Sequence, residues 1–212
     1  GQPWEYIVVT DPPVKQALHE HYRTENDNYN FWMEQMRMPE LRHPAFHWPG
    51  DPEEQWQKHK ARPGWNEAPA LIVVLGDGRR QWTTVMGGHT LGRYQSHLTD
   101  ALANTCTLMH LAAASMGLAT QWVTIHIEEG FKRILDVPDV MKIYTIIPVG
   151  YTAVPPKKGV RRPLRDIVHH DRYDRSKYMS NQEIVEYVRK MRLKTMPKYL
   201  KAASDMHKKN KA

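Results

Sequence analysis

The sequence predicts an α+β protein in which apolar strands are enclosed by helices, and three stretches of the chain indicate this class. Residues 70–75 form a continuous apolar run that ends in Gly-Asp-Gly, which is typical of a strand buried on both faces. Residues 143–151 predict a second core strand. Between these runs, apolar and small residues keep helical spacing from Leu98 to Met116, and Gly117 follows as a stop signal.

The first elements of the chain have clear boundary signals. Residues 6–9 are a short β-rich run that ends before Asp11-Pro12-Pro13, so we predict a strand followed by a turn. Asp11 is suited to cap a helix whose first position is Pro12. The helix would have one apolar face, because apolar residues recur every four positions at Val14, Leu18 and Tyr22.

Residues 23–67 differ from the rest of the chain because they are polar and rich in tryptophan and proline. A stretch this long and aromatic is too apolar for a linker. We interpret it as a lid of short helices and loops that covers a site or a partner surface.

The C-terminal part predicts two more helices. The first, at residues 128–135, would end at Asp136-Val137-Pro138. The second, beyond Asp174, has an apolar face and would end near Pro197. We therefore expect one domain over residues 1–174, with the lid inserted, and a basic helical extension over residues 175–212.

Composition limits the class of protein. The chain has 212 residues, with 41% hydrophobic and 25% charged, which suits one ordinary globular domain. It has neither an apolar run long enough for a membrane span nor a visible signal peptide, and its one cysteine, Cys106, fits a reducing compartment. We expect a cytoplasmic protein in which Cys106 is a small buried hydrophobe.

The net charge of +7 is uneven, because residues from Lys157 onward carry 17 Lys+Arg and 6 Asp+Glu, a balance of +11. Since this tail has few aromatic residues for base stacking, we expect no nucleic-acid partner. A solvated helix, with a few basic residues that neutralise a bound phosphate, is the preferred interpretation.

Familiar catalytic signatures such as GxSxG, GxGxxG after a strand and HExxH are missing. The densest histidine cluster, His169-His170-Asp171, places neighbouring side chains on opposite sides of an extended chain, so we predict no metal site. The remaining pattern suits a bound organic cofactor, which performs chemistry that side chains cannot.

Four motifs resemble the nitroreductase superfamily, in the order and spacing of that family. Residues 2–9 (QPWEYIVV) are similar to its first strand, and residues 104–118 to its central helix with an LAAxxxGL exit. Residues 147–151 (IPVGY) match its PVGY strand, and residues 161–168 (RRPLRDIV) its basic segment. The resemblance covers most of the chain outside the lid and the C-terminal tail.

The resemblance implies a nitroreductase-like fold with a mostly antiparallel sheet flanked by helices, in an intertwined homodimer. It also implies an FMN-dependent oxidoreductase, with flavins at the subunit interface and NAD(P)H as electron donor. The closest branches are those of iodotyrosine deiodinase and of the enzymes that make the lower ligand of cobalamin. One departure is that the family's N-terminal Arg-Arg-Ser-x-Arg segment does not precede the first strand in this sequence.

The same resemblance assigns flavin contacts. Trp122, Val123 and Thr124 occupy the loop that faces the flavin ring, and a backbone N–H or the Thr124 hydroxyl would steady the reduced ring, which makes Thr124 the catalytic candidate. The alternative makes Trp122 a core anchor and Thr124 an ordinary strand residue. Arg161 matches the residue that pairs with the FMN phosphate, and Arg162 is a second contact or a surface charge. Gln2 and Pro3 would touch the ring edge.

Substrate choice would come from the lid. Glu25 and Tyr29, at i and i+4 on its first helix, resemble the Glu–Tyr part of the clasp in flavin dehalogenases, with Lys60 as the basic member. Three functions stay open: reduction of a nitroaromatic or quinone, reductive dehalogenation of a halophenol or halotyrosine, and a flavin-binding or interaction protein without turnover. A small aromatic molecule is the expected substrate in the first two.

Overall fold

The structure is a computed structural model that describes residues 2–38, 42, 46, 50–60, 64–80, 94–152 and 161–195, with backbone alone at 59, 60, 94–96 and 192–195. The chain divides into two compact units, which are described separately. The first consists of Gly1–Asn30 and Gln57–Pro155, and the second of Phe31–Trp56 and Pro156–Ala212. The predicted domain limits at residues 174 and 175 stay a prediction.

The first unit is built on one antiparallel sheet. Its strands are β1 (Trp4–Val9), β2 (Ala70–Gly76), β5 (Lys142–Gly150) and β3 (Ala119–Thr120), in that spatial order, and β4 (Val123–Thr124) also pairs with β5. Strand β2 is central and lies between β1 and β5. The predicted α+β class and mostly antiparallel sheet are therefore confirmed.

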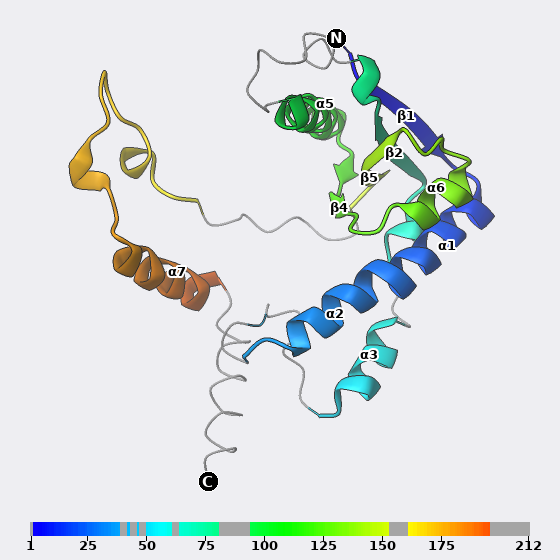
Figure 1. The fold of residues 1–212 in the computed structure, drawn as a ribbon, viewed down its shortest axis with the longest axis horizontal. Coiled ribbons are helices and arrows are strands. Elements are labelled where there is room, and N and C mark those ends of the chain that lie inside the picture. The colour runs from blue at the N-terminus through cyan, green and yellow to red at the C-terminus, as the bar shows by residue number, and fades with distance from the viewer. Residues whose placement is uncertain are drawn as a thin grey trace. The chain divides into compact units, whose positions relative to one another are not determined.

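Helices cover both faces of this sheet (Figure 1). On one face, α1 (Pro12–His21) and α6 (Glu129–Leu135) contribute Leu18 and Phe131 to a core that includes Val73 and Ile146. On the other face lies α5 (Tyr94–Ser115). Its Leu102 and Cys106 pack with strand residues Val74 and Ile147.

The predicted boundary signals are confirmed. Asp11 is the N-cap of α1, and its carboxylate accepts a hydrogen bond from Val14 N at 3.3 Å, with Pro12 at the first helical position. Gly117 ends α5 with φ of +75°, a conformation that favours glycine, and Leu118 N donates to Ala113 O at 2.9 Å. The helix predicted at residues 128–135 is α6.

Helix α1 runs into a π-helix, Tyr22–Asp27, and then into α2 (Asn28–Gln35). Sequence analysis predicted only a lid helix here. An ion pair between Arg23 and Asp27, at 2.5 Å, joins successive turns of the π-helix. Burial raises the pKa of Tyr22 to about 12, with a smaller contribution from the nearby Asp27 carboxylate.

The second unit has an aromatic centre in its lid part. Phe31 is fully buried, and its ring lies 5.2 Å from that of Trp56 and 4.8 Å from that of Trp32. Trp56 belongs to α3 (Pro52–Lys60). The lid aromatics in this unit therefore pack on one another, which explains why the segment is too apolar for a linker.

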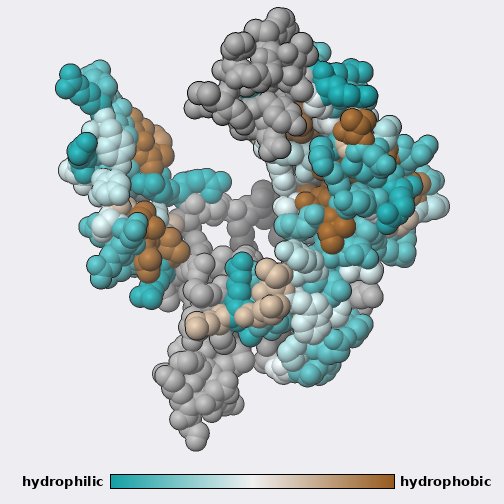
Figure 2. Space-filling view, in the orientation of Figure 1, coloured by the Kyte–Doolittle hydropathy of each residue, from teal (hydrophilic) through white to brown (hydrophobic). Residues whose placement is uncertain are grey.

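The C-terminal part of the second unit contains two single turns, Leu164–Asp166 and Arg175–Lys177, and the helix α7 (Asn181–Thr195). The predicted apolar face of α7 is exposed at Ile184, Val185 and Val188, and brown atoms lie along this helix in Figure 2. The predicted helix end near Pro197 lies outside the described residues.

Cys106 is fully buried, and desolvation raises the pKa of its thiol to about 11. Such a thiol is a poor nucleophile. Among the described helices, none is long and apolar enough to cross a membrane.

Candidate functional site

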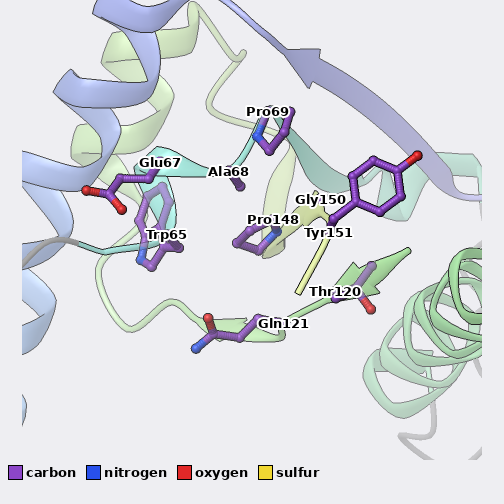
Figure 3. Close-up of a pocket in the computed structure, with 10 residues that line it drawn as sticks. Trp65, Glu67, Ala68, Pro69, Thr120, Gln121, Pro148, Gly150 and Tyr151 are labelled. Carbon is purple, nitrogen blue, oxygen red and sulfur yellow. The ribbon is translucent and has the colours of Figure 1, made fainter. Parts of the chain in front are cut away.

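A pocket at one end of the sheet brings residues of the PVGY motif together with the residues that directly follow the central-helix motif. This sheet-end pocket has a volume of about 370 Å³, which falls in the usual range for small-molecule and cofactor sites. Its wall comes from the segment before β2, from the residues after α5 and from the end of β5 (Figure 3). The lining residues are Trp65, Glu67, Ala68, Pro69, Ala119, Thr120, Gln121, Pro148, Gly150 and Tyr151.

The wall before β2 is held by a buried lysine. Lys15 on α1 is 9% exposed, and its Nζ donates to Ala68 O at 2.7 Å and to Pro69 O at 3.4 Å. Trp65 packs edge-on against Tyr22, with ring centres 5.6 Å apart. These contacts fix the pocket wall to α1, so the lysine serves the structure there rather than facing a ligand.

Gly150 is required by the same wall. A Cβ at this position would lie 2.8 Å from Cδ of Pro69, which is closer than real Cβ contacts allow. The glycine of the PVGY motif therefore lets β5 approach the start of β2, and this close approach shapes the pocket.

The residues after α5 are fixed by side chains as well as by strand pairing. Thr120 Oγ1 lies 2.6 Å from Nδ1 of His110, and the Trp122 ring stacks on the His110 ring with centres 5.8 Å apart. Trp122 also meets Tyr144 edge-on at 5.5 Å. The Trp122 ring thus packs beside α5, and Thr120 and Gln121, rather than Trp122, line the pocket.

The other predicted residues of this loop have contrasting surroundings. Val123 is 3% exposed in the core, and its carbonyl accepts a hydrogen bond from Thr145 Oγ1 at 2.8 Å. Thr124 is exposed in β4, opposite Thr145. Neither residue is among those that line the sheet-end pocket.

The predicted ring-edge residues lie at the start of β1. Pro3 is fully buried, and its carbonyl accepts a hydrogen bond from Asp77 N at 2.7 Å. Asp77 in turn accepts hydrogen bonds from the Arg79 guanidinium, which holds the pKa of the Asp77 carboxyl below its ordinary value. Gln2 is exposed.

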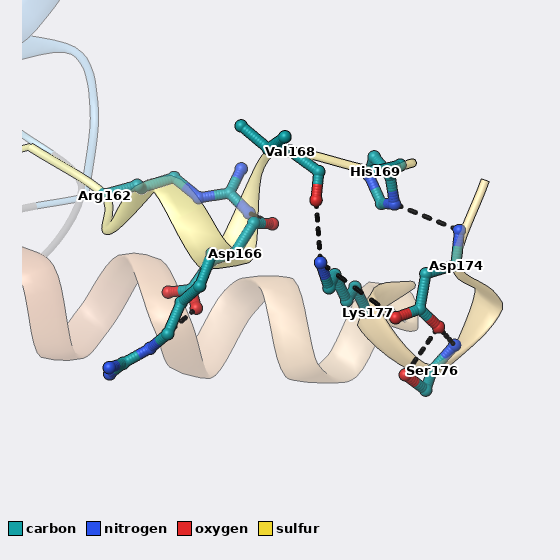
Figure 4. Close-up of polar contacts among 8 residues, drawn as sticks. Arg162, Asp166, Val168, His169, Asp174, Ser176 and Lys177 are labelled. Atoms are coloured by element: carbon teal, nitrogen blue, oxygen red, sulfur yellow. Dashed lines mark hydrogen bonds and ion pairs between the residues drawn. The ribbon is translucent and has the colours of Figure 1, made fainter. Parts of the chain in front are cut away.

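The basic segment belongs to the second unit. Arg161 and Arg162 are exposed there, and Arg162 donates to Asp166 O at 3.1 Å and lies over the Tyr187 ring at 5.8 Å. Figure 4 shows this segment, in which Lys177 Nζ also donates to Val168 O at 2.7 Å. Both guanidiniums are therefore near the surface of their own unit.

The predicted substrate residues are only partly described. Glu25 is exposed in the π-helix and Tyr29 is 50% exposed in α2, while Lys60 ends α3 and its side chain is outside the described residues. The Tyr29 ring lies 6.1 Å from the ring of His126, just beyond β4. Tyr29 thus lies beside the segment that follows Thr124.

Asn26 fixes this arrangement. It is fully buried, and its Oδ1 accepts hydrogen bonds from His126 N at 2.6 Å and from Ile127 N at 2.9 Å. The residue between Glu25 and Asp27 thus joins the π-helix to the chain that follows β4. Glu128 continues the network, because it accepts hydrogen bonds from Lys142 Nζ and Ile143 N.

Hydrogen bonds outweigh burial in their effect on the pKa of the Glu128 carboxyl. Desolvation alone raises its pKa, but the hydrogen bonds from Lys142, Ile143 and Lys132 together place the pKa below its ordinary value. Glu128 is therefore held as a carboxylate that fixes the start of α6 to β5.

A second hollow of about 710 Å³ lies between α5 and the start of β5. Its wall is mostly apolar, with Leu98, Leu102 and Ile143 among the lining residues. It contains no residue of the four sequence motifs, so we place the candidate site at the smaller sheet-end pocket.

Sequence reasoning missed Trp65, Pro69, His110 and Asn26. Trp65 and Pro69 come directly before a predicted strand, and that position was a usable signal. His110 and Asn26 act through contacts that no sequence spacing specifies.

The model of the nitroreductase family matches residues 1–151. The chain belongs to the nitroreductase family. It is 26% identical to an iodotyrosine deiodinase of Haliscomenobacter hydrossis over 153 residues, which make up 72% of this chain and 61% of that protein. The chain thus spans about three fifths of the length of this curated relative.

Two solved structures share the fold. One is an oxidized iodotyrosine deiodinase bound to FMN and 3-iodo-L-tyrosine, with a TM-score of 0.56, 17% identity, and coverage of 82% of this chain and 78% of that one. The other is the NADPH:FMN oxidoreductase of Vibrio harveyi in complex with NAD+, with a TM-score of 0.51, 16% identity, and coverage of 90% and 67%. These likenesses confirm the predicted nitroreductase-like fold.

Proposed function

We propose that this chain binds FMN in the sheet-end pocket and acts as an FMN-dependent oxidoreductase. The observation that carries the proposal is that residues 119–121, after the central helix, and residues of the PVGY motif line one pocket. Family membership and the FMN-linked relatives described above support it.

The residues of the pocket fit a flat heteroaromatic ring. Pro148 and Trp65 supply apolar surface, and Thr120 and Gln121 supply hydrogen-bonding groups. Trp65 Nε1 is buried without a hydrogen-bond partner among the described residues, so one polar atom of this wall is unpaired. The lining contains no lysine or arginine among the residues that the structure describes, so the phosphate needs cations from elsewhere.

The proposed reaction passes a hydride or electrons from NAD(P)H to a nitroaromatic or a quinone. FMN, when bound, supplies the redox chemistry that no side chain here provides. The chain positions the ring through the pocket wall, and the Thr124 hydroxyl or a neighbouring N–H is proposed to donate a hydrogen bond to its edge. The predicted flavin contacts of Gln2, Pro3, Trp122 and Val123 stay predictions, because none of these residues lines the sheet-end pocket.

Anaerobic reduction of the FMN-loaded chain tests this function. Addition of NADH or NADPH is expected to bleach the visible flavin absorbance, and p-benzoquinone or nitrofurazone is expected to restore it. A loaded protein that neither nicotinamide bleaches within minutes, although dithionite does so, would contradict the proposed donor.

Arg161 is proposed to pair with the FMN phosphate, and Arg162 to assist it. We expect Arg161→Ala to weaken FMN binding about tenfold or more, because a hydrogen bond to a charged group contributes about 1.5–3 kcal/mol. The turnover of FMN-saturated enzyme should change less. The measurement is the dissociation constant of FMN by fluorescence titration.

The matched control for this prediction is Arg165→Ala in the same segment. The Arg165 side chain is 86% exposed and pairs only loosely with Asp166, at 3.6 Å. Equal FMN affinity in the Arg161 and Arg165 variants would show that Arg161 does not pair with the FMN phosphate.

The exposed part of α5 favours a homodimer. Leu108 and Leu111 on α5 are 66% and 62% exposed, and Met116, which directly follows the helix, is 71% exposed. We propose that a second copy of the chain covers this face, because such apolar residues gain most from burial in an interface. Light scattering is expected to give twice the chain mass of 24.8 kDa for the native protein and a smaller mass for Leu111→Glu.

Reductive dehalogenation is the second candidate function, and the placement of Tyr29 beside His126 favours it. In this proposal Glu25, Tyr29 and Lys60 hold a halophenol or halotyrosine. We expect Glu25→Ala and Tyr29→Ala each to reduce dehalogenation of 3-iodotyrosine at least about tenfold, as the loss of one hydrogen-bonded contact implies. Their quinone reductase activity should stay near that of the unaltered chain.

Glu20→Ala is the control for these variants, because Glu20 lies on α1 and bonds Gln16 at 2.8 Å rather than facing His126. Unchanged rates of both reactions in the Glu25 and Tyr29 variants would contradict the proposal that these residues hold the substrate. A chain that binds FMN but lacks both activities would support the third possibility, a flavin-binding protein without turnover.

A further inference from the structure

His110 is the side chain that holds the pocket-lining residues after α5. It is half-buried on α5, and its Nδ1 lies 2.6 Å from Thr120 Oγ1 while its ring stacks on Trp122. The two contacts fall on either side of Gln121. One imidazole therefore fixes both neighbours of a residue that lines the pocket.

The backbone by itself holds this segment weakly. Strand β3 has two residues, which pair with Val149 and Gly150, and the next strand, β4, is equally short. Between them, Gln121 N donates to Pro148 O at 3.4 Å, a long hydrogen bond. The side-chain contacts of His110 are thus a substantial part of what orders residues 120–122.

The contact with Thr120 also determines what this hydroxyl offers to the pocket. A threonine hydroxyl has one hydrogen to donate and lone pairs to accept. If Nδ1 of His110 accepts that hydrogen, the pocket meets only lone pairs; if Nδ1–H donates, the hydroxyl hydrogen is left for the pocket. In both cases the imidazole fixes the direction of the Thr120 hydroxyl.

We propose that His110 is a positioning residue for the flavin pocket, acting through Thr120 and Trp122. This inference rests on the proposed function, because it takes FMN as the ligand of the sheet-end pocket. His110 itself is not among the lining residues, so it would act without contacting the cofactor.

Four variants separate the hydrogen bond from ring packing. His110→Asn keeps a polar atom near the place of Nδ1 and loses the ring, whereas His110→Phe keeps the ring over Trp122 and loses the hydrogen bond. Thr120→Val removes the hydroxyl with little change of shape, and Thr120→Ser retains it. The readouts are the FMN dissociation constant and the midpoint potential of bound FMN.

We expect His110→Phe and Thr120→Val each to weaken FMN binding about five- to tenfold, in line with the loss of one hydrogen bond. The double variant should be no weaker than either single variant, because both remove the same interaction. His110→Asn and Thr120→Ser should retain most of the affinity. The midpoint potential of bound FMN should likewise change in His110→Phe and Thr120→Val and stay near that of the unaltered chain in the other two variants. Full affinity in His110→Phe, or additive losses in the double variant, would overturn the proposal.

Hydrogen exchange is measured on the flavin-free chain, so that a failure of the proposal about His110 can be distinguished from a failure of the proposed function. Peptides that cover residues 118–124 are expected to exchange faster in His110→Phe and Thr120→Val than in the unaltered chain. If the unaltered chain does not bind FMN, the proposed function fails, and the positioning proposal for that cofactor fails with it. If it binds FMN and the exchange is the same in all variants, only the proposal about His110 fails.

Discussion

Asn26→Leu is expected to lower the free energy of unfolding by about 3 kcal/mol, since it leaves two part-buried N–H groups without an acceptor. Asn26 is fully buried, and its Oδ1 accepts from both His126 N and Ile127 N. Leucine has a similar size but no acceptor, so both N–H groups would lose their hydrogen-bond partner, and this loss lowers the stability of the folded chain. Urea unfolding measures this as a lower midpoint at an unchanged slope.

The control is Asn28→Leu, the same change at a half-buried position on α2. It should shift the free energy of unfolding by less than about 1 kcal/mol. If the two variants were equally stable, the π-helix would not be held by Asn26. The segment that carries Glu25 and Tyr29 would then need another anchor.

Gly150→Ala is expected to lower stability by about 2 kcal/mol and to weaken FMN binding at the same time. The new Cβ would lie 2.8 Å from Cδ of Pro69, and the proline ring cannot rotate away as a flexible side chain would. Because both residues line the sheet-end pocket, the shift that relieves the contact must change the pocket. Thermal unfolding and an FMN titration on one preparation measure both effects.

Gly78→Ala is the matched control for a methyl group added at a glycine. A Cβ at Gly78 would meet only Leu98 Cδ2, at 3.8 Å, which is an ordinary contact. This variant should keep its stability within about 0.5 kcal/mol and its full FMN affinity. If Gly150→Ala lost stability but kept its FMN affinity, the cofactor would have to bind away from this wall.

Local chemistry explains why the elements of the fold were predictable. The Asp11-Pro12 start of α1 and the Gly117 end of α5 depend on capping, which a few neighbouring residues determine. The apolar run of β2 required a central strand, and β2 lies between two others. In each case the signal lies within the segment that it specifies.

The arrangement of the site depends on contacts between distant residues, and the sequence pattern carries little sign of them. Lys15 holds the carbonyl of Ala68, and Asn26 holds the N–H of His126, across 53 and 100 residues of chain. The π-helix is equally hidden, because its residues suit an ordinary helix. These features follow from packing in three dimensions rather than from periodicity.

The predicted flavin loop illustrates the difference. The family resemblance located residues 122–124, and the structure places the pocket wall directly before them, at residues 119–121. Trp122 packs beside His110 and Tyr144 but is 40% exposed, so the structure does not bury it as a core anchor. Since Thr124 is exposed in β4, its proposed role stays a prediction.

Binding of FMN is the central claim, and the absorbance spectrum of the purified chain tests it most directly. We predict the two flavin bands of the near-ultraviolet and visible range, with FMN released on denaturation. If the chain is purified without cofactor, added FMN should restore these bands and stay with the protein through gel filtration. A folded, colourless chain that does not retain added FMN would contradict the proposed site and the proposed function together.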